Sequence, residues 1–233
     1  SYSKKASEPI EITDNGSKFN FLGQDIESPL PGLFNVYNML GAGMIAKCFD
    51  IDPKTIKQAL AKIHTIKGRV EKIDEGQKYE VVVDYAHTID SLEKLYSAFP
   101  NKNKICVLGN TGGGRDRWKR GGMAKVAEKN CSHIILTNED PYDENPEGII
   151  NDMAETIEEK GKLQIIMDRR GAIAEALKIA QKETASPDEH KNWVILITGK
   201  GTDPYIMIEG GKKIPWSDEE VAREEIRKIM SKM

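Results

Sequence analysis

The chain has 233 residues, of which 39% are hydrophobic and 30% are charged, and this balance predicts a globular protein with one substantial core or two smaller ones. Its formal net charge of −3, from 34 basic and 37 acidic side chains, provides no overall field that would attract nucleic acid or an anionic membrane. No apolar run approaches the roughly 18 residues of a membrane span, and residues 1–5 hold no apolar signal core, so we expect a cytoplasmic protein.

The N-terminal quarter predicts a small sheet that is closed by two helices. Short strands are expected at 10–12 and 19–22, around turn residues 14–16. Helices are expected at 35–49, where apolar residues recur at helical spacing, and from Asp52-Pro53 to about residue 63. Helices that close a preceding sheet are typical of the end of a domain, so residues 1–66 are assigned to one domain, with a linker over 65–70.

From residue 67 onward, predicted strands and helices alternate. Apolar, β-branched runs predict strands at 79–83, 104–108, 133–137, 163–167 and 193–198. Helical patterns lie at about 89–99, 121–130, 146–160 and 170–183, and the chain finishes with a hairpin near 206–214 and a helix over 217–230. Strands that are apolar on both faces and alternate with helices indicate an α/β fold, a doubly wound, Rossmann-like parallel sheet, in a second domain of residues 67–233.

The three cysteines predict free thiols. Cys48, Cys106 and Cys131 are odd in number, have no paired spacing and stand in apolar surroundings. This pattern favours inert core thiols in a reducing compartment over disulfides or a zinc site.

Polar and glycine residues follow four of the predicted strands, in the segments 84–88, 109–120, 137–142 and 198–203. Because the carboxyl ends of parallel strands lie at one edge of a sheet, these four segments are expected to face a shared crevice.

The glycine-rich segment 109–120 is not a P-loop, since it lacks the Gly-Lys-Ser/Thr needed for phosphate and magnesium. Its glycines also do not follow the dinucleotide fingerprint. Arginine forks bind carboxylate or phosphate in bidentate fashion, so the segment is interpreted as an anion site. A solvated basic turn is the alternative.

Six ordered motifs resemble the ATP-dependent Mur ligases: Leu30-Pro-Gly-Leu-Phe-Asn-Val-Tyr-Asn38, Gly68-Arg-Val-Glu71, Asp84-Tyr-Ala-His-Thr88, the 112–120 loop, Glu139-Asp-Pro-Tyr142 and Gly199-Lys-Gly201. Within that family the chain most resembles the members that add the third amino acid of the peptidoglycan stem peptide. The resemblance covers nearly the whole chain from about Leu30.

The resemblance implies that residues 1–66 end a central ATP-binding domain and that residues 67–233 form the C-terminal, amino-acid-adding domain. ATP and magnesium would then be held mainly upstream of Ser1, where the family has its P-loop, so the chain alone is expected to be inactive. The implied reaction forms an acyl phosphate on UDP-N-acetylmuramoyl-L-alanyl-D-glutamate and then an amide with a diamino acid of lysine or meso-diaminopimelate type. The chain itself is expected to hold no metal, and no general acid or base is assigned.

The resemblance also implies an ATP-facing set of residues. Asn35 and Asn38 match asparagines that hold the adenine end of ATP, with helix capping as the alternative. Arg69 matches a linker arginine that meets the nucleotide, and is otherwise a linker charge. Asp84 and His87 match a strand-end pair that approaches ATP, although His87 could instead be a structural histidine.

A second implied set faces the incoming amino acid. Arg115 falls where the family places an arginine on the acceptor carboxylate, and Lys119 and Arg120 are candidates for the nucleotide-linked substrate. Asp140 and Tyr142 are the second and fourth positions of a motif that reads Asp-Asn-Pro-Arg in diaminopimelate-adding enzymes.

The departures from that motif bear on which amino acid is added. Tyr142 removes the expected clamp for a distal carboxylate, whereas Glu139 and Asp140 would favour a side-chain ammonium. Gly199 belongs to the same acceptor set, and Asp203 stands near where the family has His-Glu. Lysine, diaminopimelate bound differently and another diamino acid all remain open, as does a surface-loop interpretation of Asp140 and Asp203.

Other interpretations concern the class of protein. One is a non-catalytic amino-acid- or nucleotide-binding module derived from a Mur ligase. Another is a ligase similar to folylpolyglutamate synthetase, which the motifs at 84–88 and 112–120 fit less well. A nicotinamide-dependent dehydrogenase is weaker still, because its glycine fingerprint is absent.

Overall fold

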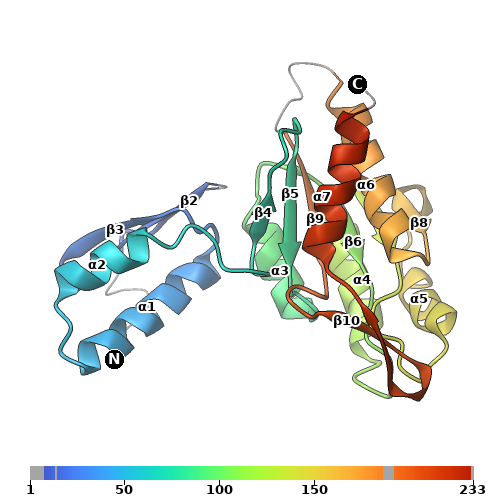
Figure 1. The fold of residues 1–233 in the computed structure, drawn as a ribbon, viewed down its shortest axis with the longest axis horizontal. Coiled ribbons are helices and arrows are strands. Elements are labelled where there is room, and N and C mark those ends of the chain that lie inside the picture. The colour runs from blue at the N-terminus through green and yellow to red at the C-terminus, as the bar shows by residue number, and fades with distance from the viewer. Residues whose placement is uncertain (1–7, 14, 186–191, 232–233) are drawn as a thin grey trace. The chain divides into compact units, whose positions relative to one another are not determined.

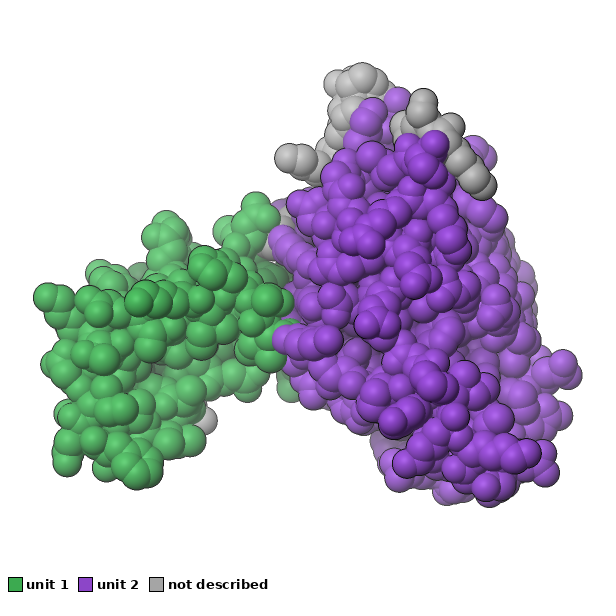
Figure 2. Space-filling model, viewed as in Figure 1, with its two compact units in different colours: residues 1–66, 94–100 green, residues 67–93, 101–233 purple. Residues whose placement is uncertain are grey.

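The computed structural model describes residues 8–13, 15–185 and 192–231, which form two compact units (Figures 1 and 2). One unit comprises residues 1–66 and 94–100, and the other comprises residues 67–93 and 101–233. Residues 1–5, where no signal core was found, and Asp14 of the expected turn lie outside the described residues. Within the described part of the chain, no helix is both long and apolar enough to cross a membrane.

The first unit contains a three-stranded antiparallel sheet and two helices. Its elements are β1 (Glu11–Thr13), β2 (Gly16–Phe21), β3 (Gln24–Ser28), α1 (Leu33–Cys48) and α2 (Pro53–Ala61). The predicted hairpin is confirmed, with Ile12 opposite Ser17, and so are both helices. β3 was not predicted, because Ile26 is its only large apolar residue. Ile26 nevertheless joins a core with Phe19 and Leu40.

The start of α2 follows from its sequence. The Asp52 carboxylate accepts hydrogen bonds from the backbone N–H groups of Lys54 (2.9 Å) and Thr55 (3.2 Å), which would otherwise have no helical partner. Pro53 fits the first helical position because it has no N–H to satisfy.

The second unit is built on a six-stranded sheet. Its strands are β4 (Glu71–Ile73), β5 (Glu80–Asp84), β6 (Asn103–Leu108), β7 (His133–Leu136), β8 (Leu163–Ile165) and β9 (Trp193–Thr198). Their order is β4-β5-β9-β6-β7-β8; β4 is antiparallel to β5 and the other neighbours are parallel. The predicted parallel, doubly wound sheet is therefore confirmed. The antiparallel edge strand β4 was not predicted, because three residues carry too little periodicity.

Helices cover both faces of this sheet. They are α4 (Lys119–Asn130), α5 (Pro146–Ala154), α6 (Arg169–Glu183) and α7 (Asp218–Met230); a further helix, α3 (Ile89–Ser97), begins in this unit, and its residues 94–97 are grouped with the first. On one face, α6 and α7 pack on alternate strand residues such as Val81, Ile105 and Ile195. On the other, α4 packs against α5, which contacts β7 (Figure 1). The predicted hairpin is β10 (Tyr205–Ile208) with β11 (Lys212–Pro215).

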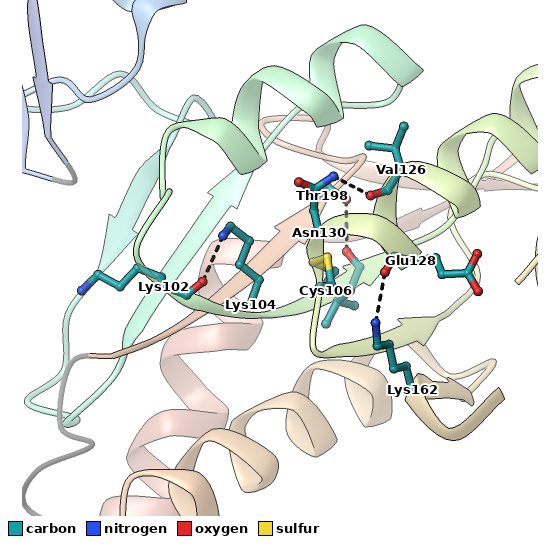
Figure 3. The surroundings of a disulfide bond; sticks show 10 residues. Lys102, Lys104, Cys106, Val126, Glu128, Asn130, Lys162 and Thr198 are labelled. Carbon is teal, nitrogen blue, oxygen red and sulfur yellow. Dashed lines mark hydrogen bonds between the residues drawn. A yellow bond between two sulfur atoms is a disulfide. The ribbon is translucent and has the colours of Figure 1, made fainter. Parts of the chain in front are cut away.

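The cysteine prediction was wrong. Cys106 in β6 and Cys131, directly after α4, form a disulfide with their Cα atoms 6.2 Å apart (Figure 3). The β6–α4–β7 crossover brings them together, because it returns the chain to the strand beside β6. Spacing along the sequence could not reveal that proximity. Cys48 is free but exposed at the end of α1, so it is not a core thiol either.

Candidate functional site

A cavity of about 460 Å³ lies at the carboxyl edge of the parallel strands, where the four polar segments meet. Its lining consists of Tyr85, His87, Thr88, Thr111, Gly114, Arg115, Asp116, Lys119, Glu139, Asp140, Tyr142, Gly199 and Asp203. The expected shared crevice is therefore present. The strands that carry it are β5, β6, β7 and β9.

Two glycines allow the loops to pack closely around this cavity. Gly112 donates its N–H to the Asp140 carbonyl (2.8 Å), and a Cβ on Gly112 would collide with the Pro141 carbonyl. Gly199 has a φ of +109°, and a Cβ there would collide with the Glu139 carboxylate. The glycines at these two positions therefore serve close backbone approach.

Glu139 is a buried acid of the cavity with one carboxylate oxygen left without a partner among the described residues. Its side chain is 2% exposed, and one carboxylate oxygen, Oε1, accepts a hydrogen bond from the Thr111 hydroxyl (2.9 Å). The other oxygen, Oε2, has no partner among the described residues. Burial raises the pKa of Glu139, although Arg169 and the Thr111 hydrogen bond oppose that shift. A cationic ligand group beside Oε2 would relieve this desolvation.

Asp140, by contrast, is fully engaged within the protein. Its two carboxylate oxygens lie 2.8 and 2.7 Å from the ammonium of Lys200, whose side chain is 1% exposed. Oδ1 also accepts the Met207 N–H (2.8 Å), which ties the β7 loop to β10. Asp140 is buried, so it is no surface-loop residue. Asp203 lies 3.7 Å from Lys200 and its side chain is 44% exposed, so it faces the cavity with less restraint.

A buried ion pair positions two of the loops that form the cavity, those after β7 and β9. Arg169 begins α6 and donates to both carboxylate oxygens of Asp218 (2.8 and 2.7 Å) at 1% and 0% side-chain exposure. Its remaining N–H groups reach the backbone carbonyls of Thr198 (2.8 Å) and Asn138 (3.3 Å). Those carbonyls stand at the ends of β9 and β7. One guanidinium therefore sets the spacing of the loops that carry Gly199 and Glu139.

Two cations of the 109–120 segment line the cavity in different ways. Arg115 is exposed, and its guanidinium carbon lies 6.0 Å from the ring centroid of Tyr142. Lys119, the first residue of α4, is 8% exposed. Tyr142 adopts a φ of +51° and donates its N–H to Met207 (3.1 Å), so its backbone is held while its ring stays half-buried.

Arg120 does not line the cavity. It is 1% exposed and pairs through two hydrogen bonds with Glu144 (2.8 and 2.9 Å), while Asp152 lies 2.7 Å from Nη1. These contacts connect α4 to α5 and the loop before α5. Lys119 and Arg120 are neighbours in sequence but have different environments, because successive helical residues point in different directions. The sequence alone did not show which of the two faces the cavity.

The β5 loop brings three of the implied ATP-facing residues together. The buried Asp84 carboxylate accepts the N–H groups of Val70 and Ala86, both at 2.7 Å. Burial raises the pKa of Asp84 although both hydrogen bonds oppose the rise. Arg69 stacks over Tyr85 at 4.6 Å. His87 Nδ1 donates to the Tyr85 carbonyl (2.8 Å), which leaves Nε2 for a ligand.

Asn35 and Asn38 lie in the first unit, on α1. The Asn35 amide is buried and donates to the Pro31 carbonyl (2.8 Å), whereas Asn38 is exposed. The N-cap position is Gly32, which makes no side-chain capping bond. Neither asparagine occupies the N-cap, and their role toward ATP stays a prediction.

Sequence reasoning missed three cavity-shaping residues. Thr111 and Tyr85 were read only as parts of motifs, and Arg169, which directly precedes the helix predicted at about 170–183, was not singled out. Arg169 carried a weak signal, since an arginine at the positive end of a helix is unfavourable unless an acid pairs with it. Its partner, Asp218, lies 49 residues away and could not be inferred from spacing.

Comparison with known proteins agrees with this arrangement of loops on a parallel sheet. The profile of the family described as Mur ligase, glutamate ligase domain, matches residues 68–201. The chain belongs to the Mur ligase family.

Curated relatives show which members of the family this chain is similar to. The chain is 40% identical over 225 residues to the UDP-N-acetylmuramoyl-L-alanyl-D-glutamate–2,6-diaminopimelate ligase of Oceanobacillus iheyensis, covering 94% of this chain and 44% of the relative. It is 36% identical over 230 residues to the ligase of the same name from Bacillus licheniformis, covering 96% and 45%. The chain therefore spans less than half the length of these relatives.

Solved structures show the same fold. A structure of UDP-N-acetylmuramoyl-L-alanyl-D-glutamate–2,6-diaminopimelate ligase superimposes with a TM-score of 0.65 at 30% identity, over 95% of this chain and 45% of that one. The folylpolyglutamate synthase of Mycobacterium tuberculosis, complexed with ADP, gives a TM-score of 0.65 at 20% identity, over 83% and 44%. The second likeness concerns the fold alone.

Proposed function

We propose that this chain is part of an ATP-dependent ligase that joins a diamino acid to UDP-N-acetylmuramoyl-L-alanyl-D-glutamate through an acyl phosphate, in the cytoplasm. Residues 1–66 would end the ATP-binding domain, and residues 67–233 would form the amino-acid-adding domain. The observation that carries the proposal is the cavity, which places cations and acids on loops of one parallel sheet. Such a lining suits a small zwitterion.

The charges of the cavity match the parts of an amino acid. Arg115 offers a planar fork for the acceptor carboxylate, and it is free to turn inward because it is exposed. Glu139 Oε2 and Asp203 offer acceptors for ammonium groups. Asp140 is excluded from direct contact by its pair with Lys200, so it acts by holding the loop. The chemistry left to these residues is positioning of the amine and exclusion of water.

The cavity also bears on which diamino acid is accepted. The relatives are named as diaminopimelate ligases, and diaminopimelate carries a second carboxylate. Tyr142 supplies no charge to hold it, while Glu139 and Asp203 favour a second ammonium. The acceptor is therefore a diamino acid of lysine or diaminopimelate type, and the balance of charges favours lysine.

ATP and magnesium enter the proposal mainly through the rest of the enzyme. Arg69, Asp84 and His87 stand together at the β5 loop, where they would meet the nucleotide. Within residues 8–13, 15–185 and 192–231, no cluster of three acidic, histidine or cysteine side chains could hold a metal. No step is derived through magnesium.

Calorimetric titration of the 233-residue chain with L-lysine, L-ornithine and meso-diaminopimelate tests the acceptor site. R115Q and D203N should each weaken the binding of the preferred amino acid at least tenfold, because each removes a charged contact. R117Q is the matched control, since Arg117 is equally basic and exposed but lies 3.5 Å from Glu144 and outside the cavity lining. Equal losses in R115Q and R117Q would contradict the assignment.

A further inference from the structure

The side chain of Lys119 is largely buried, and its ammonium has no internal partner among the described residues. The residue lines the cavity at 8% exposure, and the ammonium remains accessible from the cavity. A cation confined in a cavity is stabilised by a carboxylate or another anion. The neighbouring basic residue Arg120 shows that pattern through Glu144 and Asp152. Lys119 therefore has the environment of a group that is completed by a ligand.

The position of Lys119 in its helix also favours an anion. Lys119 is the first residue of the 12-residue helix α4, where the helix dipole is positive. The backbone N–H groups of Lys119 and Arg120 donate to the carbonyls of Asp116 and Arg117 (both 3.1 Å), so the Lys119 ammonium is the donor left for a ligand. Asp116 also lines the cavity, but it is exposed and therefore screened by solvent. The Lys119 ammonium and the helix dipole thus carry the same sign.

Lys119 and Arg115 lie toward different neighbours. One helical turn beyond Lys119, a Cβ on Gly122 would collide with the side chain of Ile89, so the first turn of α4 lies against the start of α3. The β5–α3 loop, which ends there, carries His87, whose Nε2 has no hydrogen bond among the described residues. Arg115 instead lies near the ring of Tyr142, on the β7 loop. Two cations with different neighbours are suited to two different anions.

We propose that Lys119, with His87 beside it, forms a subsite for the phosphoryl group of the acyl phosphate, separate from the acceptor-carboxylate subsite at Arg115. This inference rests on the proposed ligase function. When the amine nitrogen bonds to the carbonyl carbon, the carbon–oxygen bond to phosphate breaks and the phosphate leaves with the electron pair. One proton of the amine passes to the departing phosphate, giving an amide and hydrogen phosphate. Lys119 neutralises the charge that grows on that leaving group.

Inorganic phosphate is the probe that tests this subsite, titrated by calorimetry into the 233-residue chain at constant ionic strength, with L-lysine titrated separately. K119Q should weaken phosphate binding at least tenfold and L-lysine binding less than twofold. R115Q should show the reverse pattern. K119R keeps the charge and should retain phosphate affinity within about threefold. The thermal unfolding midpoint of each variant shows whether it is folded.

Other results would overturn either the phosphate subsite or the acceptor assignment. Absence of phosphate binding to the wild-type chain, or an unchanged affinity in K119Q, overturns the subsite. A loss of L-lysine affinity in K119Q equal to that in R115Q also overturns it, because Lys119 would then belong to the acceptor site. If R115Q leaves L-lysine binding intact while K119Q still loses phosphate, the proposed acceptor assignment fails and the anion subsite stands.

Discussion

Replacement of Asp218 by alanine should destabilise the second unit strongly. Asp218 is fully buried and accepts three hydrogen bonds, two from Arg169 and one from the Trp216 indole N–H (2.7 Å). Its removal leaves the Arg169 guanidinium buried without a counter-charge, which costs about 3–5 kcal/mol. For a domain of this size, that loss lowers the unfolding midpoint by roughly 6–20 °C.

Urea unfolding followed by circular dichroism measures this loss, with E224A as the control on the same helix. Glu224 pairs with Arg170 at 54% and 39% side-chain exposure, so its removal should cost less than about 1 kcal/mol. The double variant R169M/D218L should recover only part of the loss, because Arg169 also satisfies the Thr198 and Asn138 carbonyls. Equal destabilisation by D218A and E224A would refute the reasoning.

Three further results are expected. Since burial raises the pKa of Glu139, the neutral form of this side chain stabilises the folded protein. That stability is fully present below about pH 4.3, the ordinary pKa of glutamate, and is lost as pH rises through the raised pKa. E139Q should flatten this decline in pH-dependent urea unfolding, and an unchanged slope would exclude Glu139 as its source. C131S should lower the free energy of unfolding by about 3 kcal/mol, given the 25-residue separation from Cys106, whereas C48S should not change it; a reducing agent should then have no additional effect on C131S. G199A should abolish L-lysine binding in calorimetry because its Cβ displaces the Glu139 carboxylate, and retained binding would show that the carboxylate can move without consequence.

The sequence was sufficient for the architecture of the second unit because its strands are long and apolar on both faces. β5 and β9 each combine β-branched residues with complete burial of most positions, so their pattern was unambiguous. β3 and β4 were missed because a short amphipathic strand that is stabilised by its neighbours leaves almost no local pattern. The insertion of β9 between β5 and β6 is a tertiary fact with no local sequence signal.

At the candidate site, the loops were predictable but the pairing of their charges was not. Strand ends with polar residues located the cavity, since topology alone places them at one edge. The residues Asp140 and Arg120 look like ligand-binding groups in sequence, yet each is held by a partner 24 or more residues away. Lys119, which lacks such a partner among the described residues, and Glu139, whose Oε2 lacks one, could be recognised only after the internal contacts were known.

Amide formation by the ligase of which this chain is proposed to be part tests the central claim most directly. The enzyme would be supplied with ATP, UDP-N-acetylmuramoyl-L-alanyl-D-glutamate and, separately, L-lysine, L-ornithine or meso-diaminopimelate, with R115A and D203A beside the wild type. We predict that one diamino acid is ligated and that both variants raise its KM at least tenfold. ATP consumption without ligation of any diamino acid, or variants with unchanged KM, would contradict the assignment of this cavity as the amino-acid site.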